Sequence, residues 1–140
     1  MLGGHVQLQR GVVTTTFAYL GATVLVLMDL SYLSRFWTQF EAWCSMQKCT
    51  TEGLLSAPEA ERRAVVKCIH NAPATMGKTL VGMWGNVNAQ QAHDLLKKPD
   101  VSVTNAKDKE MQLPKMLKLD EDVRAAMVRA STHVVDIDDN

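Results

Sequence analysis

A tryptophan and a glutamate in the stretch 33–41 have a spacing that could serve one chemical task. If this stretch is helical, Trp37 and Glu41 are one turn apart and share a face. An indole offers a stacking surface to a planar ring. A neighbouring carboxylate can hold a ribose hydroxyl or stabilise an oxocarbenium-like centre, as in glycosidases. On spacing alone, the plainer alternative is a core tryptophan beside a solvated glutamate.

The elements around this pair favour a binding site. An uncharged, apolar run predicts a buried strand over 23–29, followed by a turn over 30–34 and a helix over 35–47. Ligands of open α/β sheets bind outside the carboxyl ends of the strands. The turn and the first helical residues lie at that edge, so Ser34, Arg35 and Trp37 are candidates for substrate binding.

The same stretch, Leu33-Ser34-Arg35-Phe36-Trp37-Thr38-Gln39-Phe40-Glu41, resembles the Toll/interleukin receptor (TIR) domain superfamily. TIR-like domains of eukaryotic microbes carry Leu-Ser-Arg-x-Trp-Cys-x-x-Glu after a buried strand, and this chain differs in having Thr38 at the cysteine position. The resemblance implies a flavodoxin-like sheet and a signalling role through self-association or a protein partner. In the enzymatic branch it implies Glu41 as the catalytic residue of NAD glycohydrolysis. NAD would then be a substrate, and no cofactor is expected.

A second candidate site follows the apolar strand predicted over 64–70. Gly77-Lys78-Thr79 matches the end of a phosphate-binding loop, whose lysine and hydroxyl reach phosphates and Mg²⁺. However, Ala72 replaces the first glycine of that loop, and Pro73 removes an N–H donor. We therefore favour an ordinary loop before a helix. The residues kept as a second candidate site are His70, Asn71, Lys78 and Thr79.

The remaining pattern alternates helices with short apolar runs. It predicts helices over 7–20, 78–84, 88–98 and 120–130, a third strand over 101–104, a loop over 48–61 and an exposed surface segment over 107–122. This alternation is typical of an α/β fold with an open parallel sheet and helices on both faces. Three strands are few for such a sheet, so we expect its N-terminal strands to be missing. The chain then forms one domain over 1–135 with an acidic tail over 136–140.

The amino-acid composition limits the kinds of partner and ligand that we expect for this chain. Fifteen Lys and Arg balance fifteen Asp and Glu, which argues against nucleic acid as a partner, because neutralising phosphates needs a basic surplus. Three cysteines without a CxxC pair and four scattered histidines predict no metal site and suit a reducing compartment such as the cytoplasm. The uncharged run 11–28 reaches the lower limit for a membrane span. Its glycines and threonines favour the end of a buried helix followed by a strand.

Three functions remain open at this level. The first is a TIR-like signalling or NAD-processing domain that is inactive as this isolated chain. The second is a non-catalytic interaction module that pairs with another chain through an exposed sheet edge, since unpaired edges are templates for such pairing. The third is a nucleotide binder that uses Gly77-Lys78-Thr79.

Overall fold

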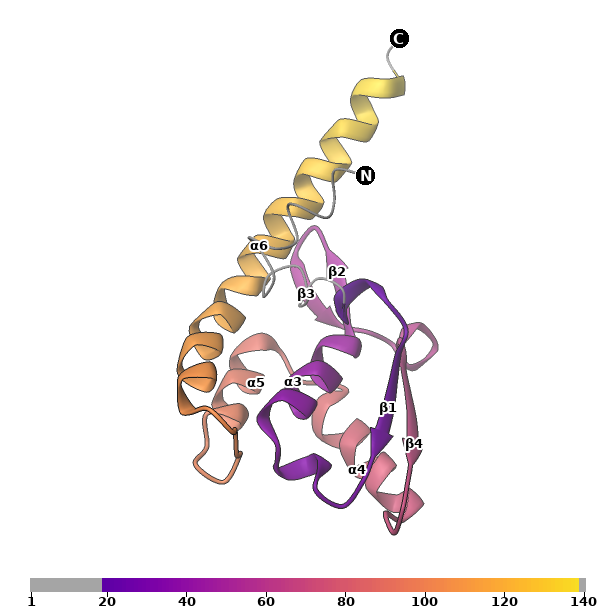
Figure 1. The fold of residues 1–140 in the computed structure, drawn as a ribbon. Coiled ribbons are helices and arrows are strands. Elements are labelled where there is room, and N and C mark those ends of the chain that lie inside the picture. Colours follow the sequence, from indigo (N-terminus) through magenta and orange to yellow (C-terminus); the bar gives the residue numbers. More distant parts are fainter. Residues whose placement is uncertain (1–18, 139–140) are drawn as a thin grey trace, which may run out of the picture.

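The chain folds as a mixed α/β structure, as predicted. The computed structural model describes the backbone of residues 19–138 and the side chains of residues 19–132. The predicted helix over 7–20 lies almost wholly outside the described residues. The elements are β1 Val24–Met28, the 3-10 turn η1 Tyr32–Ser34, α3 Phe36–Ser45, β2 Gln47–Thr50, β3 Gly53–Ser56, the 3-10 turn η2 Glu59–Glu61, β4 Ala64–Cys68, α4 Ala74–Trp84, α5 Ala89–Leu96 and α6 Ala106–Asp138 (Figure 1).

β1 and β4 form a two-stranded parallel sheet, which confirms that the two apolar runs are strands of a parallel sheet. The register pairs Val24 with Ala64 and Met28 with Cys68. Side chains alternate along β1: Val26 and Met28 are buried in the core, whereas Leu25 and Leu27 are exposed. Among the described elements, α3 and α4 contact this sheet, and they cover the face of Val26 and Met28.

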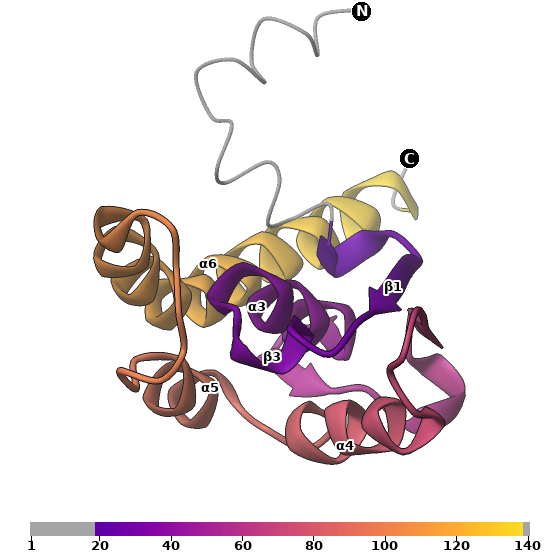
Figure 2. The same cartoon turned by 60° about the horizontal axis from the view of Figure 1, so that its bottom comes forward.

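α3 is the centre of the core and contacts α4, α5 and β1 (Figure 2). The 3.6-residue spacing predicts a buried face, and Phe36, Phe40 and Trp43 are indeed fully buried. The indole N–H of Trp43 donates to the carbonyl of Val87 at 2.8 Å, so this large ring is packed without losing its polar bond. Gln47, predicted as the last helical residue on this face, instead begins β2.

The predicted loop over 48–61 is wrong, because it contains most of an antiparallel hairpin. β2 pairs with β3 from Gln47 opposite Ser56 to Thr50 opposite Gly53. Gly53 has φ +104, a left-handed conformation that favours glycine. The hairpin packs against α6, and the Leu54 N–H donates to Asp120 Oδ1 at 2.8 Å. The two strands, Gln-Lys-Cys-Thr and Gly-Leu-Leu-Ser, lack a continuous apolar run, and they lie against a helix far along the chain.

The predicted third strand over 101–104 is also wrong. It contributes an isolated parallel bridge between Arg35 and Ser102, and it does not join the β1–β4 sheet. The Phe36 N–H donates to the Ser102 carbonyl at 2.8 Å, and the Ser102 N–H donates to the Ser34 carbonyl at 2.8 Å. The first N–H groups of a helix have no partner within it. Ser102 satisfies one of them at the start of α3.

α4 and α6 differ most from the helices that the sequence predicts. α4 begins at Ala74 rather than at 78, with Pro73 at the N-cap position, where its fixed φ suits helix entry. α6 runs from Ala106 to Asp138 and so includes both the predicted surface segment over 107–122 and part of the predicted tail over 136–140. It projects beyond the rest of the fold (Figure 1). Its buried side chains repeat every three or four residues: Gln112, Met116, Leu119 and Val123.

The uncharged run 11–28 lies only partly within the described residues. Its last five residues form β1, whereas residues 11–18 lie outside the described part. Within residues 19–138, none of the helices combines the length and the apolar character that a membrane crossing requires.

Candidate functional site

The carboxyl edge of the β1–β4 sheet carries a polar cluster centred on Asp29. Its Oδ1 accepts hydrogen bonds from the Ser31 hydroxyl at 2.8 Å and the Ser31 N–H at 3.0 Å. The Arg35 guanidinium lies 3.7 Å from the same oxygen. The hydrogen bond from the Ser31 hydroxyl, helped by the Arg35 and His70 charges, holds the pKa of Asp29 below its ordinary value. The predicted site residues do not include Asp29, although an aspartate directly after a buried strand marks the carboxyl edge of a sheet.

The hydroxyls of Ser34 and Thr38 donate hydrogen bonds to backbone carbonyls near the start of α3. The Ser34 hydroxyl donates to the Ser31 carbonyl at 2.8 Å, and the Thr38 hydroxyl donates to the Tyr32 carbonyl at 2.8 Å. The Ser34 carbonyl also accepts from the Ser102 hydroxyl at 3.0 Å. These bonds fix the turn that presents Arg35. A substrate would therefore meet the Arg35 guanidinium rather than an uncommitted Ser34 hydroxyl.

Trp37 and Arg35 share a small pocket. The pocket has a volume of about 260 Å³, and its other walls come from Phe36, Thr38 and residues 102–104. The Trp37 ring packs edge-on against Phe36, with centroids 5.3 Å apart, and remains 36% exposed. An exposed indole beside a guanidinium can hold a planar, anionic group. The structure thus brings together two of the three predicted substrate-binding side chains.

Glu41 lies apart from this pocket and has a partner that the sequence does not reveal. The Tyr19 hydroxyl donates to Glu41 Oε1 at 2.9 Å. Burial, together with the bond and the charge of Glu41, raises the pKa of Tyr19 to about 12. Tyr19 precedes β1, so Glu41 lies beside the residues that lead into the strand. Ser34 and Arg35 instead lie at the strand's carboxyl end.

The second candidate site is split. Gly77 is the fourth residue of α4, so Lys78 and Thr79 lie within the helix, and the Thr79 hydroxyl donates to the Thr75 carbonyl at 3.0 Å. A phosphate-binding loop instead needs free N–H groups just before its helix. His70, with φ +53, ends the strand segment and lies close enough to Asp29 to lower its pKa. His70 therefore groups with the Asp29 cluster, and Asn71 follows it in the same turn.

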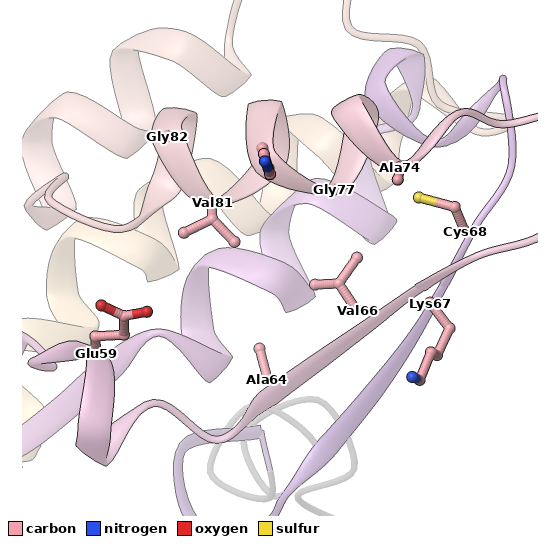
Figure 3. Close-up of a pocket in the computed structure, with 10 residues that line it drawn as sticks. Glu59, Ala64, Val66, Lys67, Cys68, Ala74, Gly77, Val81 and Gly82 are labelled. Atoms are coloured by element: carbon pink, nitrogen blue, oxygen red, sulfur yellow. The ribbon is translucent and has the colours of Figure 1, made fainter.

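A groove of about 790 Å³ is lined by residues of β4 and α4, which pack against each other at Gly77 (Figure 3). We call it the β4–α4 groove. One wall is the alternate residues of β4, and the other is a row of small residues on α4. The groove has no signal in the sequence, because residues 71–77 are predicted as a loop and only 78–84 as a helix. The lining side chains are Glu59, Ala64, Val66, Lys67, Cys68, Ala74, Gly77, Lys78, Val81 and Gly82.

The three cysteines belong neither to the Asp29 cluster nor to the lining of the Arg35–Trp37 pocket. Cys44, Cys49 and Cys68 are all free, and burial raises the pKa of Cys44 well above its ordinary value, which favours the protonated thiol. Nowhere in the described part do three His, Cys, Asp or Glu side chains gather as metal ligands would.

Comparison with protein-family models, with curated proteins and with solved structures finds no match for this chain. The resemblance to TIR-like domains accordingly stays a prediction that depends on the motif over 33–41.

Proposed function

We propose that this chain is a protein-interaction module that binds another polypeptide through its open β1–β4 sheet. The observation that carries the proposal is an apolar sheet face whose side chains stay exposed within the described part of the chain. Leu25 is 60% exposed, Leu27 52% and Val65 45%, and the register places Leu25 directly beside Val65. We call these three residues the outer sheet face. Contiguous exposed apolar side chains of this kind are typical of interaction surfaces.

The two-stranded sheet supports the same function. Isolated strand pairs are marginal in water, and parallel sheets are normally covered on both faces. Within residues 19–138 each strand of this sheet has one partner, so both outer edges are free. A second polypeptide that covers the face or extends an edge would complete the architecture that the strand–helix alternation predicts. The three free thiols fit a reducing, cytoplasmic setting for this role.

Site-specific crosslinking can test this function. A photoreactive residue replacing Leu27 should capture a protein in the native cells, whereas one replacing Met111, 60% exposed on α6, should not. The captured protein, once purified, should bind the wild-type chain. It should bind a Leu25→Ser/Leu27→Ser variant at least about tenfold more weakly, because burying one leucine contributes roughly 1.5–3 kcal/mol.

Two outcomes would contradict the proposal. Crosslinking to the same proteins from both positions would indicate adventitious contacts. Unchanged binding by the double variant, with circular dichroism showing an intact fold, would place the interaction elsewhere.

NAD processing by a TIR-like site is the second candidate. The observation that favours it is the pocket where exposed Trp37 and Arg35 lie together. We rank it below the interaction function because Glu41 does not line that pocket and its carboxylate already accepts the Tyr19 hydroxyl bond. Nicotinamide release from NAD, compared between wild type and Glu41→Ala, distinguishes the two.

A further inference from the structure

The outer edge of β4 has a regular row of unpaired backbone groups. The Val24 N–H donates to the Arg63 carbonyl at 2.7 Å, and the Ile69 N–H donates to the Met28 carbonyl at 3.0 Å. These two bonds fix the phase of the parallel ladder, so Val65 and Lys67 direct their N–H and C=O groups toward β1. The residues between them, Ala64, Val66 and Cys68, direct their N–H and C=O groups away from β1. In the described part of the chain no strand lies on that side of β4.

The β4–α4 groove runs along this same edge. Figure 3 shows Ala64, Val66 and Cys68 on the side of β4 that faces α4. The α4 wall leaves open space at Gly82, where an added Cβ would meet no atom within 4 Å, whereas at Gly77 an added Cβ would meet Val66 at 3.4 Å and Cys68 at 3.6 Å. Because β4 leaves a row of N–H and C=O groups unpaired along the groove, an extended segment can pair with it, as neighbouring strands do at a spacing of about 4.8 Å.

The two ends of the groove carry charges of opposite sign. Glu59 lies near Ala64 at the amino end of β4 (Figure 3). At the other end, Lys67 projects from the sheet face opposite α4 (Figure 3), while Lys78 lies on α4 itself. The start of α4 adds the positive end of a helix dipole near Cys68. A bound segment with an acidic residue at this end would complement the groove.

We propose that the β4–α4 groove binds an extended, apolar segment of a partner protein, which adds a strand to the edge of β4 and places an acidic residue between Lys67 and Lys78. This inference rests on the proposed interaction function and names its site and the chemistry of its partner. Main-chain bonds to Ala64, Val66 and Cys68 would give affinity, and the narrow apolar groove would select side chains on alternate positions.

Selection from a library of random short peptides, displayed against the purified full chain, provides the test. Enriched peptides should alternate apolar β-branched residues and carry Asp or Glu at one end. Gly82→Arg fills open space without a clash and should weaken their binding at least about tenfold. Thr79→Arg adds the same charge on the same helix outside the groove and should leave affinity unchanged. Lys78→Glu should weaken acidic peptides and not neutral ones.

Each other outcome is decisive. Failure to enrich any peptide, or equal binding of enriched peptides to Gly82→Arg and wild type, would overturn the groove proposal. If binding is instead lost only in the Leu25→Ser/Leu27→Ser variant, the interaction function survives and the groove does not. If sedimentation shows a dimer that Gly82→Arg dissociates, the occupant is a second copy of this chain rather than a partner segment.

Discussion

Replacing Arg63 with alanine is expected to lower the free energy of unfolding by about 3 kcal/mol, because its guanidinium connects three segments of the fold. Arg63 Nη2 donates to the Gln47 carbonyl at 2.8 Å and to the Cys44 carbonyl at 3.2 Å. Its Nη1 donates to the Ala22 carbonyl at 3.0 Å and also to the Tyr19 carbonyl. One side chain thus holds the entry to β1, the end of α3 and β2 around the start of β4.

The magnitude follows from these four bonds. A hydrogen bond from a charged donor contributes roughly 1.5–3 kcal/mol, but bonds that share one donor group do not add. Removing one partner of a buried charged network costs about 3–5 kcal/mol. Because the Arg63 guanidinium is only partly buried, we expect the lower end of that range. Arg63→Lys should cost less, since an ammonium can keep some of the four carbonyls bonded.

Urea denaturation followed by circular dichroism is the appropriate assay. With a slope of about 1.5 kcal/mol per molar, a loss of 3 kcal/mol moves the midpoint down by about 2 M. Arg62→Ala is the matched control, because Arg62 makes two longer bonds, at 3.3 Å to the Ala57 carbonyl and at 3.4 Å to the Gly85 carbonyl. If Arg63→Ala shifted the midpoint no more than Arg62→Ala, the bridging role assigned to Arg63 would be refuted.

Three further outcomes are expected. Gly53→Ala should destabilise the fold by about 2–4 kcal/mol in urea titration, because residue 53 has a positive φ and the added Cβ would collide with Asp120. Gly82→Ala, the control, should be neutral or stabilising, and equal effects of the two substitutions would contradict this explanation. Because the pKa of Tyr19 is raised from 10.0 to about 12, its stabilising effect is present below pH 10 and is lost as the pH rises through about 12. Absorbance titration should show this late ionisation and an earlier one in Glu41→Gln; a wild-type midpoint near 10 would exclude the Tyr19–Glu41 bond. The purified chain should release no nicotinamide from NAD, and release that Glu41→Ala abolishes would instead favour the NAD-processing alternative.

The sequence correctly predicts those parts of the fold in which apolar residues form a short run or recur at helical spacing. The runs that became β1 and β4 are short and apolar, and α3 places Phe36, Phe40 and Trp43 on one face by helical spacing alone. The hairpin lacks such a pattern, and it packs against α6, which is far along the chain. Asp120 bonds to Leu54 across 66 residues of sequence, and no local window contains that information.

Some parts of the candidate site could likewise be predicted from the sequence, and others could not. Arg35 and Trp37 come together because one turn and the start of one helix present both. The partner of Glu41 lies 22 residues earlier, at Tyr19, beyond the reach of any motif. The β4–α4 groove depends on which side of β4 has no further strand, and the sequence predicted a strand over 101–104 that lies elsewhere.

Amide hydrogen exchange along β4, measured by NMR on the free chain at low concentration, tests the open sheet most directly. The N–H groups of Val65 and Lys67 point toward β1 and should exchange slowly, whereas those of Val66 and Cys68 should exchange much faster. A bound partner segment should slow the exchange of Val66 and Cys68 alone. Equal, strong protection of all four amides in the free chain would mean that the edge is already covered, and would contradict the account of an open sheet that recruits another polypeptide.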